Sequence, residues 1–169
     1  MRILLPPSRT VRAGAPQEAP PLERYTGVLY RALGAEQWSA ASRRWAAETL
    51  LVHTAEHGLV GAAAAPGEPV DLARLMREAG PLVDLRSKEY ARRAPVPPGA
   101  WTLRVVSEDG DGRRLTVSHW NKHHKGVLVA ALARDRPRPR RLDGLLRWAA
   151  GAGLRLERAE EGVLELVVS

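Results

Sequence analysis

Short runs of apolar residues alternate along this chain with stretches in which apolar residues recur every three or four positions. The short runs are typical of buried strands, and the wider spacing is typical of helices with one buried face. The apolar runs predict strands at residues 3–5, 50–53, 82–85 and 163–168. The wider spacing, together with capping residues, predicts helices at residues 28–33, 36–50, 71–79, 87–94, 121–133 and 142–150.

Three further segments carry turn or loop signals. Residues 101–107 and 113–119 are β-type runs joined by Glu108-Asp109-Gly110-Asp111-Gly112, which predicts a β-hairpin. Residues 9–21 combine a glycine and three prolines with little apolar content, so we expect a mobile loop there. Residues 58–69 are rich in Ala, Gly and Pro and are predicted to be irregular.

The predicted helices and strands alternate, and the hairpin adds an antiparallel element. This pattern predicts a mixed β-sheet covered by helices, which is an α/β fold. A length of 169 residues and an apolar content of 44% agree with one domain, spanning residues 1–169, that has its own core.

Several classes of protein are disfavoured by what the sequence lacks. The absence of cysteine excludes a disulfide scaffold, thiolate metal sites and a cysteine nucleophile. No run of about 18 apolar residues occurs, so we expect no membrane span. The apolar run at the start is short and meets Pro6-Pro7, which argues against a secretory signal and favours a cytoplasmic protein. No phosphate-binding loop or dinucleotide fingerprint is present, so no cofactor is expected.

The chain is strongly basic, with a net charge of +7 and an isoelectric point near 10.7. Such a surface attracts phosphate groups, either in nucleic acid or in a small anion. Five arginines alternate with prolines in residues 134–141, which favours a solvated, semi-extended connector. A nucleic-acid-binding arm is the alternative, although this segment holds no aromatic residue on which a base could stack.

The first polar cluster precedes the helix predicted at residues 28–33. Tyr25 and Thr26 lie in the turn before it, next to Arg24. Backbone N–H groups at a helix start, a threonine hydroxyl and an arginine together can hold an anion. Ordinary capping of the helix by Thr26 is the alternative.

The second polar cluster is at the end of the strand predicted at residues 82–85. Asp84 lies inside this apolar strand and is followed by Arg86, Ser87 and Tyr90. Ligands of open α/β sheets gather at the carboxyl ends of the strands, which makes these residues candidates for binding. A buried carboxylate needs a partner, so a structural Asp84–Arg86 pair, with Ser87 as a helix cap, is the alternative.

The third polar cluster runs from Ser118 to Gly126. It includes Asn121 and two of the only three lysines, Lys122 and Lys125, whose spacing puts them on one face of a helix. Burial can lower the pKa of a lysine enough for base or amine chemistry, whereas arginine cannot serve in this way.

The histidines do not make a convincing metal motif. His119 and His123 have helical spacing, but no HExxH pattern and no third ligand accompany them. We therefore expect these residues and His124 to lie on the surface or in a basic pocket, with no metal. His53 is the last residue of a predicted strand and is interpreted as a hydrogen-bonded core or cleft residue rather than a catalyst.

Five segments, in this order, resemble blocks of the YaaA (peroxide stress protein) family. They are Leu4-Leu5-Pro6-Pro7-Ser8, the Tyr-Thr-Gly segment at 24–33, the strand and Gly turn at 50–60, the Asp-Leu-Arg-Ser segment at 83–95, and the Ser-x-x-Asn-Lys-x-x-Lys-Gly segment at 118–128. The chain is thereby identified as a shortened, actinobacterial-type member. The resemblance implies the family's single-domain α/β fold, a part in protection from hydrogen peroxide, and DNA binding.

Carried over residue by residue, the resemblance also implies a site. Its members are Ser8, Tyr25, Thr26, Asp84, Arg86, Ser87, Tyr90, Ser118, Asn121, Lys122 and Lys125. The chain lacks the long helical segment that precedes the family's Tyr-Thr-Gly block, and residues 62–69 replace an Arg-Pro and Tyr-Arg-Leu region. A surface for duplex DNA could have been lost with those pieces, whereas the polar segments remain.

Three hypotheses follow. The first is a small cofactor-free enzyme that acts on an anionic or nucleotide-like small molecule. Lys122 would be its base or amine, oriented by Asn121 and Ser118, while Asp84 or Tyr90 would carry the second proton. Substrate-binding groups would be Ser8, Tyr25, Thr26, Arg86, Ser87 and Lys125.

The second hypothesis is a DNA-binding protein of the peroxide stress response. The third is a relic in which the polar residues serve only the fold.

Overall fold

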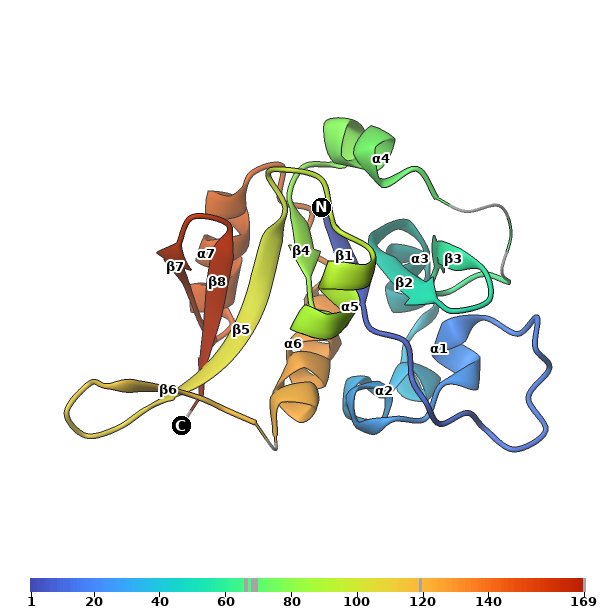
Figure 1. Cartoon of the computed structure of the whole chain (residues 1–169), viewed down its shortest axis with the longest axis horizontal. Helices are drawn as coiled ribbons and strands as arrows, with labels where there is room; N and C mark the ends of the chain where they lie inside the picture. The colour runs from blue at the N-terminus through green and yellow to red at the C-terminus, as the bar shows by residue number, and fades with distance from the viewer. Residues whose placement is uncertain (66, 68–69, 119, 169) are drawn as a thin grey trace.

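A computed structural model describes residues 1–65, 67, 70–118 and 120–168 of the chain (Figure 1). The strands are β1 (Arg2–Leu5), β2 (Leu50–Thr54), β3 (Gly58–Gly61), β4 (Leu82–Asp84), β5 (Trp101–Glu108), β6 (Arg114–Thr116), β7 (Arg155–Glu160) and β8 (Val163–Val168). The helices are α1 (Pro21–Arg24), α2 (Val28–Leu33), the 3-10 turn η1 (Ala35–Gln37), α3 (Ala40–Thr49), α4 (Leu72–Ala79), α5 (Lys88–Arg93), α6 (Asn121–Asp135) and α7 (Leu142–Gly151).

The strands form one mixed sheet in the order β3-β2-β1-β4-β5-β8-β7, with β6 paired to β5. Strands β2, β1, β4, β5 and β8 run parallel, and β3, β6 and β7 are antiparallel additions. The predicted α/β fold with a mixed sheet and covering helices is therefore confirmed. Its parallel centre places the carboxyl ends of β1, β2 and β4 at one edge of the sheet.

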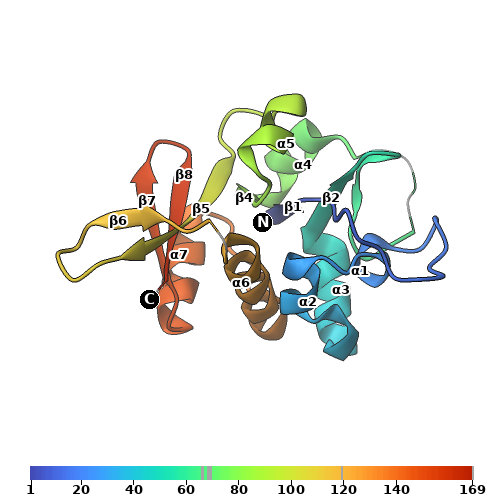
Figure 2. The same ribbon diagram turned by 60° about the horizontal axis from the view of Figure 1, so that its bottom comes forward.

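Helices cover the two faces of the sheet unequally. Alternate residues of a strand point to opposite faces, so Ile3 and Leu5 enter the large core whereas Leu4 enters a small one. In Figures 1 and 2, α3, α6 and α7 lie along one face, and α5 lies on the other face, in front of β1 and β4. Side chains of α4, including Leu72 and Leu75, pack in the smaller core with Leu4.

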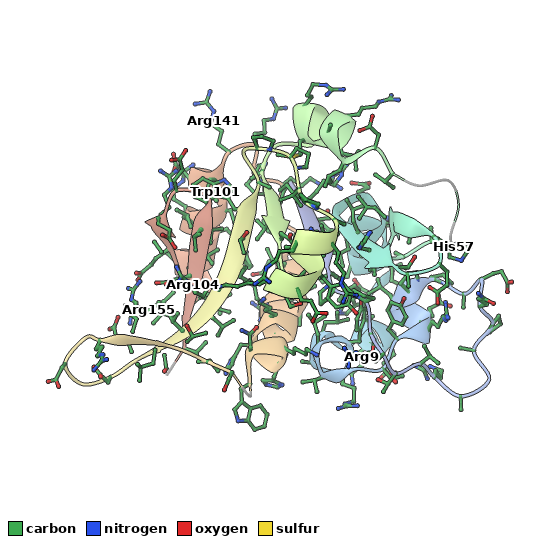
Figure 3. All side chains as sticks on the ribbon, in the orientation of Figure 1. Arg9, His57, Trp101, Arg104, Arg141 and Arg155 are labelled. Carbon is green, nitrogen blue, oxygen red and sulfur yellow. The ribbon has the colours of Figure 1, made fainter. Side chains whose placement is uncertain are left out.

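The outer face of β5, β8 and β7 carries charged side chains. The strand register sets Glu165 of β8 between Arg104 of β5 and Glu157 of β7. Two carboxylates side by side would repel each other, and Arg114 of β6 donates hydrogen bonds to both of them. Arg104 and Arg155 complete this face, as Figure 3 shows.

Capping residues set the ends of several predicted elements. Helix α4 begins after Asp71, whose side chain accepts a hydrogen bond from the Arg74 N–H. Helix α5 begins after Ser87, which accepts from the Tyr90 N–H. Such caps satisfy N–H groups that have no partner within the helix. The predictions of a helix at 28–33 and a strand at 163–168 are confirmed by α2 and β8.

Four sequence-based predictions need correction. Residues 58–61 are not irregular but form β3, because backbone pairing with β2 does not depend on large side chains. The helix expected from residue 36 begins at Ala40, since Ser39 caps it and η1 precedes it. Strand β7 was not predicted at all. Strand β6 is only Arg114–Thr116, shorter than the expected 113–119, of which residue 119 lies outside the described residues.

Parts of the predicted loop at residues 9–21 and of the predicted connector at residues 134–141 belong to the neighbouring helices α1 and α6. Residues 134 and 135 of the Arg/Pro segment belong to α6, which ends at Asp135. Pro21 of the 9–21 loop begins α1, and Val11 of the same loop forms an isolated bridge with Tyr25. The Arg12 N–H also donates to the Arg24 carbonyl at 2.7 Å. The mobility of this loop stays a prediction.

Candidate functional site

The Pro-Ser turn after β1 is bonded to the Tyr-Thr-Gly segment. The Gly27 N–H donates to the Ser8 Oγ at 3.1 Å, and the Ser8 hydroxyl lies 2.9 Å from the Thr10 carbonyl oxygen. A side chain at Gly27 would bring its Cβ within 2.5 Å of the Ser8 Oγ, so the contact requires glycine. Thr26 does not cap α2; Gly27 is the N-cap residue, without a side-chain cap. The alternative in which Thr26 is an ordinary cap is therefore wrong.

Two tyrosines fill the space beneath this turn. The rings of Tyr25 and Tyr30 meet edge to face, with centroids 5.1 Å apart. The Tyr30 hydroxyl donates to the Pro6 carbonyl at 2.7 Å, and burial raises the pKa of Tyr30 well above 10.0. Burial also raises the pKa of Tyr25, with a smaller contribution from Glu56. Tyr30 was not among the predicted site residues.

Asp84 and Arg86 form a buried ion pair at the end of β4. The Arg86 Nη2 donates to Asp84 Oδ2 at 2.8 Å, and the Nε donates to Oδ1 at 3.0 Å. The Arg86 backbone N–H also donates to Oδ1, at 2.9 Å, and Nη2 donates to the Ala94 carbonyl at 2.8 Å. Both side chains are only 1% exposed. Most hydrogen-bond donors of Arg86 are thus engaged within the protein. This is the arrangement expected if the Asp84–Arg86 pair serves the fold and does not bind a ligand.

Lys125 is the buried amine of the chain's third polar segment. Its Nζ donates to the Leu85 carbonyl at 2.9 Å, directly after β4. Burial lowers the pKa of Lys125 from 10.5 to about 8, and the nearby Asp84 carboxylate opposes part of this shift. Lys122, by contrast, is exposed near the start of α6. The two lysines are therefore three residues apart in sequence but differ completely in environment.

The spacing of apolar residues in α6 explains why Lys125 is the buried lysine. The buried positions Leu128, Val129 and Leu132 follow Lys125 by three, four and seven residues and define one face of the helix. Gly126 lies next to Lys125 and lets α6 approach α2, because a Cβ there would lie 2.4 Å from the Leu29 carbonyl oxygen. Extending the apolar face backwards along the sequence would have distinguished Lys125 from Lys122.

His53 lies near the Asp84–Arg86 pair, and Tyr90 lies near Tyr25. Burial lowers the pKa of His53, Arg86 lowers it further, and Asp84 acts in the opposite direction. His53 is thus electrostatically coupled to the Asp84–Arg86 pair. Tyr90 is half-buried and contributes to the raised pKa of Tyr25. The sequence-based interpretation of His53 as a hydrogen-bonded core or cleft residue stays a prediction; the structure places it, half-buried, near the end of β2.

The remaining predicted site residues do not join this group through hydrogen bonds within the described part of the chain. Ser87 caps α5, and the Asn121 side chain donates to the Val117 carbonyl at 3.2 Å. Ser118 and Lys122 are exposed. The structure thus brings together Asp84, Arg86, Lys125 and His53, with Ser8, Tyr25 and Tyr90 belonging to the same edge. The chemical roles assigned to all of them stay predictions.

The histidines of the third segment gather around an aromatic contact. The His123 ring lies edge to face against Trp120 and His124, with centroids 5.4 Å and 5.6 Å away. His119 lies outside the described residues.

Within residues that the structure describes, no group of three His, Cys, Asp or Glu side chains is arranged to hold a metal ion. None of the helices there has the length and apolar content that a membrane span requires.

Comparison with known proteins defines the family. No protein-family model matches the chain. A UPF0246 protein of Corynebacterium efficiens is 36% identical over 95% of this chain and 74% of its own length. A UPF0246 protein of Corynebacterium glutamicum (strain R) is 31% identical over 82% of this chain and 64% of its own length. The chain belongs to the UPF0246 family. This is the YaaA family of the resemblance, which is therefore confirmed.

Proposed function

We propose that this UPF0246 chain is a cofactor-free enzyme in which the Lys125 amine performs acid–base or nucleophilic chemistry on an anionic or nucleotide-like small molecule. The observation that carries the proposal is a buried amine, with its pKa lowered to about 8, at the carboxyl edge of the parallel strands β1 and β4. A pKa near the working pH supplies both the protonated and the neutral form, which proton transfer requires.

The neighbours of Lys125 support the same chemistry. Asp84 lies close enough to favour the ammonium form, and Arg86 holds Asp84 in place through three side-chain hydrogen bonds. The ammonium form of Lys125 has three N–H donors and uses one of them on the Leu85 carbonyl, which leaves donors for a substrate. Two cations against one carboxylate leave a net positive centre, which favours an anionic substrate.

Other residues take supporting roles in this proposal. His53 and Tyr90 are the candidates for the second proton carrier, because each combines partial burial with an electrostatic link to the edge residues. Lys122, Asn121 and Ser118 would contact the substrate from the start of α6. We assign to Lys125 the base or amine role that the sequence analysis gave to Lys122, because Lys125 is buried and Lys122 is exposed.

The alternative function is that of a DNA-binding protein of the peroxide stress response. The net charge of +7 favours it. Two of the five arginines in residues 134–141 are paired with carboxylates, however: Arg134 with Asp135 at 2.7 Å and Arg138 with Glu48 at 2.7 Å. This pairing reduces the charge available to phosphates, so we favour the enzyme.

A ligand screen by thermal shift tests the proposal. Wild type, Lys125→Met and the matched control Lys122→Met would be screened against nucleotides, sugar phosphates, small carboxylates and a short DNA duplex at two salt concentrations. We expect a small anion to raise the melting temperature of wild type and Lys122→Met but not of Lys125→Met. Stabilisation by DNA alone, with a steep loss in salt and no effect of Lys125→Met, would refute the enzyme.

A further inference from the structure

A second basic site lies at the opposite end of β1 from Lys125. A cavity of about 620 Å³ opens where β1 begins, and it is also lined by the end of α3, the end of α4 and the Arg/Pro segment. Strand β1 runs from Arg2, at this cavity, to Leu5, next to the candidate site. The two sites are thus separated by the length of a central strand.

Four arginines and one carboxylate line this cavity. The arginines are Arg2, Arg77, Arg138 and Arg140, and the carboxylate is Glu48. Glu48 pairs with Arg138 at 2.7 Å, and Arg2 donates to the Met1 carbonyl at 3.4 Å. Within the described residues, neither Arg77 nor Arg140 has a carboxylate partner. Four cationic residues that line one cavity repel each other, and an anion bound among them would relieve that repulsion.

The backbone of the Arg/Pro segment is held in place by three contacts. The Trp45 indole donates to the Pro137 carbonyl at 3.1 Å. Gly80 has a φ of +79° and lies so close that a Cβ would approach the Arg140 carbonyl oxygen to 2.8 Å. A Cβ at Gly144 would lie 3.1 Å from the Pro139 Cβ. The segment is therefore packed against α3, the turn after α4, and α7.

This packing decides between two uses of the arginines. A flexible arm for duplex DNA would present its charges along an extended exposed stripe, whereas here the segment forms one wall of a cavity. The cavity has the volume typical of small-molecule sites. Guanidinium groups bind phosphate oxygens in a bidentate manner, which suits a ligand that carries more than one phosphate.

We propose that this cavity is a binding site for a small polyphosphate anion, either a nucleoside diphosphate or an inorganic pyrophosphate group. Arg77 and Arg140 bind the phosphates, while Arg2 also lines the cavity and Arg138 is paired with Glu48. The site is independent of the chemistry proposed for Lys125.

Isothermal titration calorimetry with the full chain tests this site. The probes are inorganic pyrophosphate, ADP and a 12-base-pair DNA duplex, and the variants are Arg77→Ala and Arg140→Ala. Arg141→Ala is the matched control, because Arg141 is adjacent and exposed but does not line the cavity; Figure 3 places it at the outer rim of the molecule. Unchanged circular dichroism would show that each variant folds.

We expect wild type to bind pyrophosphate or ADP, and Arg77→Ala and Arg140→Ala to weaken binding by about 10-fold each. Arg141→Ala and Lys125→Met should bind as wild type does, the latter because it changes only the other site. Tighter binding of ADP than of pyrophosphate would assign the site to a nucleotide, and the reverse would assign it to the phosphate groups alone. No binding of either small anion, or an equal loss with Arg141→Ala, would overturn the proposal.

Discussion

Burial affects the charged side chains at the carboxyl edge in two ways. The burial of Lys125 is only partly compensated, whereas Asp84 and Arg86 compensate each other. Lys125 loses water on folding, which disfavours its ammonium form, and one backbone carbonyl and the more distant Asp84 compensate only in part. Asp84 and Arg86 compensate each other directly through paired hydrogen bonds. Burial therefore moves the pKa of the Lys125 amine towards neutral pH.

Replacing Lys125 should change how stability depends on pH. The folded-state pKa of about 8 lies below the ordinary value of 10.5, so the unfolded chain binds more protons between these pH values. Wild type should therefore gain about 3 kcal/mol relative to Lys125→Met as pH rises from 8 to 10.5. Urea unfolding of both proteins across this range measures the difference. A pH-independent difference would contradict the lowered pKa.

Removing one partner of the buried ion pair should be strongly destabilising. Asp84→Asn leaves the Arg86 guanidinium buried without a negative partner, and we expect a loss of about 3 kcal/mol in the free energy of unfolding. Glu89→Gln is the matched control, because the Glu89–Arg93 pair is exposed and should contribute less than about 1 kcal/mol. Urea denaturation compares the two. Equal effects would mean that the Asp84–Arg86 pair is not desolvated.

At the scale of elements, the contact between α2 and α6 positions the site. Helix α2 carries the Tyr-Thr-Gly segment at its start, and α6 carries Lys125. Gly126 allows the two helices to meet at the Leu29 carbonyl and the Ala32 side chain. The distance between these helices therefore depends on the absence of one methyl group.

Gly126→Ala tests this packing. Its Cβ would lie 2.4 Å from the Leu29 carbonyl oxygen and 2.6 Å from the Ala32 Cβ, neither of which can rotate away. We expect a loss of about 1–3 kcal/mol in the free energy of unfolding, despite the higher helix propensity of alanine. Gly151→Ala, at the exposed end of α7 with nothing within 4 Å, should be neutral or stabilising. Thermal and urea unfolding of both variants give the comparison, and equal effects would contradict close packing.

At the scale of the whole molecule, the two halves of the sheet are stabilised differently. Strands β1, β2 and β4 have apolar side chains on both faces, with helices packed against them. Strands β5, β8 and β7 have an apolar inner face, while their outer face carries Arg104, Glu157 and Glu165. Arg114 links the carboxylates there, so charge neutralisation takes the place of a covering helix.

The ion pairs on this outer face should make stability sensitive to acid. The hydrogen bond from Arg114 lowers the pKa of Glu157 below its usual 4.5. Its contribution is therefore present above pH 4.5 and is lost as pH falls through the lower folded-state pKa. Arg114→Met should lower the urea midpoint at pH 7, and the difference from wild type should shrink towards pH 3. A difference that persists at pH 3 would assign the effect to packing instead.

Most elements of the fold could be predicted because their signals are local. The cap at Asp71, the turn at residues 108–112 and the apolar run of β8 each lie within a few residues of the structure they specify. Strand β7 could not be predicted, since its sequence Arg-Leu-Glu-Arg-Ala-Glu is mostly polar and is stabilised by partners from β5, β6 and β8. Strand β3 could not be predicted either, since its two glycines disfavour a strand. Like β7, it is stabilised by pairing with a strand elsewhere in the chain, here β2.

The sequence by itself determined the α/β class, the family and the segments that carry polar residues, because helix periodicity, strand runs and caps are written in adjacent positions. Only the tertiary structure decided which of these residues are desolvated and paired. Burial depends on what packs from elsewhere in the chain. This long-range packing buries Lys125 but not Lys122, and it engages most hydrogen-bond donors of Arg86. The same long-range packing brings Arg2, Arg77 and Arg140 together at one cavity, although they are distant in sequence.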